Sequence, residues 1–254
     1  MRHKPQRTID IARALGVHPN TLRLYETLGY LPPVPRAANG YRRFSPLHVE
    51  HARLAIMTLS WPYVTERQTL ITLVVSAARA DYGAAMELAY QNLTQIRIER
   101  TYAESAVEFL ERWAAGYPMD AAAERMHITQ AAQYLRVTVD MLRNWERNGL
   151  ITVPRDPQNG YRLYGVPEFG RLRVIRMLVQ SGYSLMSILR MFRQFDAGSR
   201  HNLREALEVP PEDSASEHLN VIADRWLSSL ISLEERAQAI IRQISLLMEM
   251  ARQP

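Results

Sequence analysis

The sequence predicts a mostly helical protein made of two copies of one unit, each copy followed by a long helix. Residues 8–63 recur at residues 128–183 with a constant offset of 120 and no gap. Each copy begins with two short segments of helical apolar periodicity around a tight turn, and each half ends in a much longer periodic segment. A duplication of this kind fixes the architecture, and two copies suggest a dimer whose subunits are fused into one chain.

The identities that support the duplication spread over the whole repeat. Each of the following residues of the first copy recurs 120 positions later: Ala12, Leu15, Val17, Leu22, Arg23, Glu26, Gly29, Asn39, Gly40, Tyr41, Arg42, Arg53, Met57 and Tyr63. Other pairs keep their chemistry, as Tyr25 with Trp145 and Phe44 with Tyr164 do.

Composition narrows the classes of function. The 254 residues suit two units of about 120 residues each. A net charge of +5 and a pI of about 9.6 favour a polyanionic partner. The chain has no cysteine, which excludes disulfides, thiolate metal sites and thiol redox switches within it. It has no signal-type apolar segment at its start and no run of about 18 apolar residues, so we expect no membrane span and a cytoplasmic location.

Each copy opens with a predicted helix-turn-helix. In the first copy, residues 8–15 form one helix and a second begins at Pro19, which tolerates the first helical position, and stops near Gly29. In the second copy, residues 129–135 form the first helix, and Thr138 is the expected N-cap of the second, which ends at Gly149.

A polar Asn-Gly turn follows each helix pair. Asn39-Gly40 and Asn159-Gly160 lie between aromatic or β-branched residues, which is a strong signal for a two-stranded hairpin whose central residues adopt positive φ. We interpret each hairpin as a wing. Ser45-Pro46 should then cap a third helix. This third helix and a fourth are expected at 47–59 and 65–80 in the first copy, and at 167–180 and 185–195 in the second.

Each half ends in a long helix, expected at about 84–115 and 216–251. The second shows alternating apolar spacings of three and four, typical of a coiled-coil seam, whereas Arg100 interrupts the seam of the first. Residues expected to pair the long helices are Ile96, Leu110, Leu230, Leu233, Ile240, Ile244 and Leu247. The domains expected are 1–81 and 118–207 for the two winged units, 82–117 for the first long helix with its linker, and 208–254 for a loop with the second long helix.

These motifs resemble the MerR family of bacterial transcription regulators. The resemblance lies in Val17–Leu31 with Asn39–Ser45, and again in Val137–Ile151 with Asn159–Tyr164 and Ser181–Ile188. It implies two winged helix-turn-helix domains, double-stranded promoter DNA as partner, and cooperation with RNA polymerase. Family members are usually homodimers with one such domain per chain, joined by antiparallel C-terminal helices. This chain carries two domains and lacks the cysteines of the metal and redox sensors, so the effector stays open.

In a helix-turn-helix the second helix enters the major groove and its N-terminal residues reach base edges. Asn can pair with adenine, Thr can contact a thymine methyl group, and Asp can accept from cytosine but stands away from phosphates. The expected contacts of the first half are His18, Asn20, Thr21, Arg23, Leu24 and Tyr25. Those of the second half are Thr138, Asp140, Met141, Arg143, Asn144 and Trp145. Because the two sets differ, the operator should be only loosely palindromic.

The wings are expected to contact phosphates without reading sequence. The wing contacts are Gly40, Tyr41, Arg42, Arg43, Gly160, Tyr161 and Arg162. Structural alternatives remain for some residues. Tyr25 and Trp145 could be core aromatics, and Arg23 and Arg143 could form ion pairs with Glu26 and Glu146.

The sequence gives little sign of a metal site, an enzymatic activity or a ligand site. The histidines show no metal-ligand spacing, and His48 with His51 reads as a solvated or phosphate-facing pair. No phosphate loop or nucleophile–base motif occurs, so we predict neither an enzyme nor a cofactor. A small-molecule effector could bind among aromatic residues near the long helices, although these residues could equally pack the junction. They are Trp61, Tyr63, Tyr90, Tyr102, Trp113 and Trp226.

The favoured interpretation is a sequence-specific DNA-binding regulator acting as an intramolecular pseudo-dimer. By the resemblance, it would bend and untwist a promoter so that RNA polymerase can engage it. Three alternatives stay open: a repressor that does not remodel DNA, an adaptor whose second half binds protein, and a protein that sequesters a drug. Asp140 and Leu163, which stands where the first wing has Arg43, favour the adaptor. Neither the operator, the sign of regulation nor further dimerisation follows from the sequence.

Overall fold

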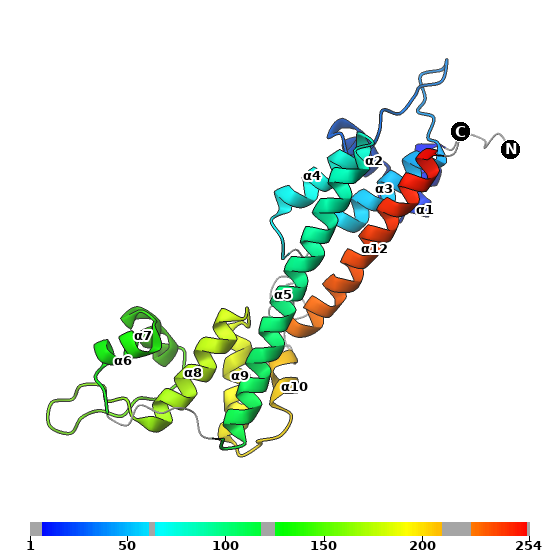
Figure 1. Ribbon diagram of the computed structural model, residues 1–254. Coiled ribbons are helices and arrows are strands. Elements are labelled where there is room, and N and C mark those ends of the chain that lie inside the picture. Colours follow the sequence, from blue (N-terminus) through cyan, green and yellow to red (C-terminus); the bar gives the residue numbers. More distant parts are fainter. Residues whose placement is uncertain (1–6, 61–63, 118–124, 210–224, 253–254) are drawn as a thin grey trace. The chain divides into compact units, whose positions relative to one another are not determined.

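The computed structural model describes residues 7–60, 64–117, 125–209 and 225–252, and nearly all of their regular structure is helical (Figure 1). Contacts divide the described residues into two compact units. The first unit holds the residues up to Ile98 together with those from Ile231 onward, and the second holds Glu99–Leu230.

The described residues of the first head form the helices α1 (Thr8–Ala14), α2 (Pro19–Thr27), α3 (Pro46–Leu59) and α4 (Arg67–Ala78). Gly16, at φ +67°, makes the tight turn between α1 and α2. The predicted cap at Ser45 is confirmed, because its side chain accepts from His48 N and His48 Nδ1 bonds back to Ser45 N. The helix-turn-helix encloses a small apolar core around Leu22 and Phe44.

The second head repeats this order, and its described residues include a further short helix, α10. Its helices are α6 (Ile128–Leu135), α7 (Val139–Arg147), α8 (Val166–Gln180), α9 (Leu185–Asp196) and α10 (Leu203–Glu208). The side chain of Thr138 accepts from Met141 N at 3.1 Å, which confirms the predicted cap of α7. Arg136 occupies the left-handed turn position that Gly16 fills in the first head, at φ +51°. The sequence did not predict α10.

The wings are hairpins, but they are not regular two-stranded ladders as predicted. Each has one isolated bridge across its arms, Arg36 with Arg42 and Arg155 with Arg162. Prolines in the first arm of each hairpin, such as Pro35 and Pro154, lack the N–H donor that a longer ladder needs. Only the glycine of each Asn-Gly pair has positive φ, so the predicted turn with two positive φ angles is also wrong.

The two long helices are α5 (Tyr82–Ala114) and α12 (Trp226–Arg252). Residues 216–225 of the predicted second helix lie mostly outside the described residues. The part of α12 within the first unit runs antiparallel to the beginning of α5, because Arg97 pairs with Glu234 at 2.8 Å while Ala85 and Ala89 share a core with Ile244 and Leu247. All the predicted pairing residues are buried: Ile96, Leu110, Leu230, Leu233, Ile240, Ile244 and Leu247.

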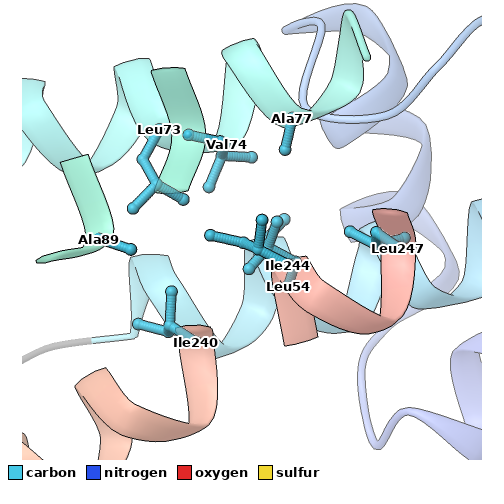
Figure 2. Packing of buried hydrophobic residues seen from close by; sticks show 10 residues of the cluster. Leu54, Leu73, Val74, Ala77, Ala89, Ile240, Ile244 and Leu247 are labelled. Carbon is cyan, nitrogen blue, oxygen red and sulfur yellow. The ribbon is translucent and has the colours of Figure 1, made fainter. Parts of the chain in front are cut away.

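The last helix also completes the core of the first head. Figure 2 shows Ile240, Ile244 and Leu247 of α12 against Leu54 of α3 and against Leu73, Val74 and Ala77 of α4. Gln243 Nε2 donates to Glu50 O at 3.1 Å and Arg236 Nη1 donates to Ser60 O at 2.8 Å. A helix from the second half of the sequence is therefore built into the first head.

The end of α5 is correspondingly built into the second head. Trp113 packs against Phe195 at 4.7 Å and against Phe192 at 5.9 Å between ring centroids. A Cβ on Gly170 of α8 would lie 2.7 Å from the Trp113 indole nitrogen, so this glycine lets the indole approach closely. The expected domains assigned each long helix to the head before it in sequence, whereas the compact units divide both helices between the two heads.

The start of α12 is held by the second head. Glu208 of α10 accepts from Leu227 N and Ser228 N, both at 3.1 Å, which supplies a carboxylate cap to the first turn of α12. Trp226 donates its indole N–H to Ser181 O at 2.6 Å and covers Gly182, whose φ is +93°. In the part of the chain that is described, no helix is long and apolar enough to cross a membrane.

Candidate nucleic-acid interface

Helix α2 presents the predicted reading residues of the first head. His18, Asn20, Arg23 and Leu24 are exposed, and Thr21 is half-buried. His18 caps the helix, with its ring nitrogen accepting from Asn20 N at 3.2 Å. Tyr25 is half-buried, packs against both apolar clusters of the first unit and lies 5.5 Å from the Tyr30 ring, which supports its core alternative.

Helix α7 presents a different face in the second head. Thr138, Asp140 and Arg143 are exposed, while Met141 and Asn144 are half-buried. Trp145 is only 2% exposed, so it is a core residue and cannot serve as the DNA contact that the sequence suggested. The alternation of outward and inward residues follows from the amphipathic periodicity of a short helix.

The wing tips are exposed, as are Arg36, Arg43 and Arg155, whereas Arg42 and Arg162 are half-buried. Tyr41 and Tyr161 are 73% and 66% exposed. Arg42 donates from Nε to Glu26, and Arg162 donates from Nε to Glu146, both at 2.5 Å, and both pairs are half-buried. Arg42 and Arg162 are therefore bonded to the recognition helices, and their contact with phosphates stays a prediction.

The same contacts correct the predicted ion pairs of the recognition helices. The arginine bonded to Glu26 is Arg42 of the wing, and the one bonded most closely to Glu146 is Arg162. Arg23 instead donates to the neutral Asn20 Oδ1 at 3.2 Å, and Arg143 pairs with Asp140 at 3.4 Å. The pairing could have been found from the repeat, because both members of each pair recur at the offset of 120.

A basic groove lies between α2 and the wing of the first head. It has a volume of about 470 Å³, and its lining includes Arg7, Arg23, Arg42 and Arg43 together with Tyr41. Four guanidinium groups around one concave surface favour a polyanion, because each can bond phosphate through several N–H donors. Arg7 was missed from the sequence, since nothing in its local pattern links it to the wing.

The corresponding surface of the second head is charge-balanced. Arg155 and Arg162 converge on Glu146, at 3.5 and 2.5 Å. Asp156 holds the turn of this wing by accepting from Gln158 N and Asn159 Nδ2, both at 2.9 Å. Arg155 bridges to Arg162 as Arg36 bridges to Arg42, and Leu163 stands where the first wing has Arg43.

The two histidines of α3 are buried, which corrects the expectation of a solvated or phosphate-facing pair. The ring of His48 bonds to Ser45 through Nδ1, and its Nε2 bonds to Pro33 O at 3.1 Å. His51 is 1% exposed and stacks on Tyr82 at 6.2 Å between centroids. Burial and the neighbouring His48 lower the pKa of His51 to about 4. Among the described residues, no group of three or more His, Asp or Glu side chains could hold a metal ion.

The aromatic residues suggested for an effector that the structure describes are either exposed or packed against neighbouring helices. Trp61 and Tyr63 lie outside the described residues. Tyr90 and Tyr102 are 54% and 57% exposed, and Trp113 and Trp226 pack in separate places described above. The packing alternative therefore holds for these two tryptophans. Arg100 pairs with Glu104 of its own helix at 2.9 Å.

Comparison with known proteins finds the same family at both heads. A family model described as "MerR HTH family regulatory protein" matches residues 126–194, and one described as "MerR family regulatory protein" matches residues 7–44. Both describe regulatory proteins rather than enzymes. No solved structure matches the chain.

Curated relatives are regulators as well. The "HTH-type transcriptional regulator CueR" of Escherichia coli O157:H7 is 30% identical over 77 residues, which are 30% of this chain and 57% of that protein. A "Probable heavy metal-dependent transcriptional regulator" of Haemophilus influenzae is 26% identical over 119 residues, which are 47% of this chain and 82% of the relative. The match to the first relative therefore spans little more than half of its length.

Proposed function

The chain belongs to the MerR family of transcription regulators, and on this premise we propose that it binds one promoter operator as a single-chain pseudo-dimer in the bacterial cytoplasm. Its two heads would enter successive major grooves with α2 and α7. The wings would fix the register through phosphate contacts. Because the reading faces of α2 and α7 differ, the two half-sites would differ in sequence.

The observation that supports the pseudo-dimer is the sharing of the long helices. Ile240, Ile244 and Leu247 of α12 fill the core of the first head, and Trp113 of α5 fills a gap in the second. In a homodimer, contacts of this kind would be made between two subunits. Here one chain supplies both sides, so no second copy is needed to complete either head.

On a promoter, such a molecule would act by distorting the DNA between its half-sites. We propose that it bends and untwists the spacer so that RNA polymerase can contact both promoter elements. Smooth bending of a site costs about 1–6 kcal/mol, which the wing and recognition-helix contacts must offset. An effector, if this regulator uses one, would need a site other than a thiolate metal cluster, because the chain has no cysteine.

The stoichiometry of the complex tests this proposal. A selection from random duplexes would first supply the operator, and native mass spectrometry would then weigh the purified chain on a minimal duplex of about 20–25 base pairs, the span of two half-sites one or two helical turns apart. We expect one chain per duplex and an affinity that falls steeply with salt. Two chains on the minimal site would refute the pseudo-dimer, and a lack of sequence preference would refute the regulator itself.

One further function has a specific observation in its favour. The charge-balanced surface of the second head would suit an adaptor in which only the first head binds DNA and the second binds protein. Such an adaptor would leave one half of the operator without sequence preference, which the same selection would reveal.

A further inference from the structure

The two heads carry the same fold but present different electrostatic surfaces at the same positions. In the first head, Arg23 bonds to a neutral amide, and Arg36 donates to the backbone carbonyl of Gly40 at 3.3 Å. Neither of these bonds neutralises the guanidinium charge. Arg7 and Arg43 line the same groove as Arg23, so the first head presents several cations to a polyanion.

In the second head, the arginines at the equivalent surface are matched by carboxylates. Asp140 pairs with Arg143 at 3.4 Å and is itself 89% exposed. Glu146 accepts from both Arg155 and Arg162. Arg155 holds the bridge position that Arg36 holds in the first wing, but it is paired with Glu146, and Leu163 takes the position of Arg43. These are differences between corresponding positions in two copies of one fold.

Resting on the proposed function, we propose that the two heads divide the work of DNA binding, the first supplying phosphate affinity and the second discriminating sequence through Asp140. Cations bind any duplex, because every phosphate attracts them and releases counterions. An exposed carboxylate at a groove-facing position is repelled by phosphates, and a correctly placed cytosine amino group relieves this cost by donating to it. Asp140 therefore weakens binding to the wrong sequence more than to the right one.

Matched substitutions on the two recognition helices test this division. Arg23→Gln in α2 and Arg143→Gln in α7 remove the same charge at positions related by the repeat. We expect Arg23→Gln to weaken binding to a random-sequence duplex severalfold and to lower the salt slope by about one. Arg143→Gln should leave the salt slope nearly unchanged, since Arg143 bonds to Asp140 rather than to a phosphate, although the unpaired Asp140 carboxylate should then weaken binding by repulsion.

The reciprocal exchange at the neighbouring position tests Asp140 itself. Asp140→Asn should tighten binding to the random duplex, steepen its salt dependence and lower the preference for the selected operator by about tenfold, the size of one base contact. Asn20→Asp in the first head should instead weaken binding to the random duplex. All four substitutions are at exposed positions, and circular dichroism with thermal melting would confirm that the variants fold.

The outcomes separate this inference from the function on which it rests. If the unaltered chain prefers its operator but Arg143→Gln lowers the salt slope as much as Arg23→Gln, the division of work is wrong and the regulator stands. If Asp140→Asn leaves the operator preference unchanged, Asp140 does not discriminate and the second head serves another partner. If the unaltered chain shows no operator preference, the proposed function fails.

Discussion

At the scale of single residues, the most informative contact is the ion pair between each recognition helix and its wing. Arg42 bonds to Glu26 through Nε, so its two terminal nitrogens stay available for phosphate. Glu26 would thus fix the direction of the guanidinium before DNA arrives. Such preorganisation increases affinity by reducing the ordering cost of binding. The same geometry recurs in the second head, where Arg162 bonds to Glu146 through Nε.

Whether Glu26→Gln raises or lowers the affinity for the operator tests whether Glu26 positions the wing. Glu26→Gln removes a negative charge near the DNA-facing surface, so a purely electrostatic account expects tighter binding. If the carboxylate positions Arg42, we expect weaker operator binding by about threefold to tenfold, in line with one lost charged contact. Arg42→Ala should weaken operator and random duplexes alike and lower the salt slope by about one. Tighter operator binding by Glu26→Gln would contradict the positioning role.

The buried His51 makes the stability of the first unit depend on pH. Its folded pKa of about 4 lies below the ordinary value of 6.5, because burial and His48 disfavour the charged form. The unfolded chain therefore takes up a proton before the folded chain does. The stabilisation is fully present above pH 6.5 and is lost as the pH falls towards 4.

Urea titrations at pH 7.5 and pH 4.5 would check this effect. We expect the unaltered chain to lose about 2–3 kcal/mol of unfolding free energy from this group, and His51→Gln to lose correspondingly less between the same two pH values. Equal losses in both proteins would show that other groups govern the acid sensitivity.

At the scale of elements, the apolar stripe of α12 should control DNA binding from a distance. Ile240 is 2% exposed between α5 and the first head, so Ile240→Glu would bury an uncompensated charge there. We expect α12 to detach, and operator binding to be replaced by weak, salt-sensitive binding of any duplex. Leu246→Glu, on the same helix but at a position 40% exposed, is the matched control and should bind normally.

Gel-shift titrations with operator and random duplexes, together with circular dichroism, would compare the two variants. A folded Ile240→Glu protein with unchanged operator affinity would show that the stripe does not hold the heads in register. Loss of binding by Leu246→Glu as well would point to a general effect of added charge on the helix.

The elements themselves were largely predictable, because periodicity, caps and the repeat are local signals. Thr138 and Ser45 identified helix starts, and the spacing of Leu233, Ile240 and Leu247 identified the buried stripe. What packs against that stripe was not predictable, since a period shows which face is apolar but not which partner covers it. The sequence therefore suggested a helix pair and missed the core that α12 shares with α3 and α4.

The errors at the candidate site have a similar origin. A hairpin tip indicates exposure for the backbone, yet Arg42 folds back onto Glu26, and this contact is made in three dimensions. His48 and His51 were expected to face solvent or phosphate because they are polar, but α3 buries them against the start of α5 and the segment before the wing. Trp145 is buried at a position where the first head keeps a half-buried Tyr25.

At the scale of the whole molecule, covalent linkage of the two halves should be visible in the unfolding transition. A homodimer unfolds at a temperature that rises with its concentration, because dissociation accompanies unfolding. This chain supplies both sides of the shared cores, so we expect its midpoint to stay constant over a hundredfold range of protein concentration. Calorimetry would check this, and a rising midpoint would indicate that two chains associate in the folded state.

The use of α12 in the first head also has a consequence for biosynthesis. The ribosome makes Leu54 and Leu73 early, but it makes Ile240, Ile244 and Leu247 only when the chain is nearly finished. Until then the first head emerges with an uncovered apolar face, and contacts between such distant parts of a chain form slowly. The nascent first half is therefore the stage most exposed to aggregation, and a message truncated before residue 240 would leave it open permanently.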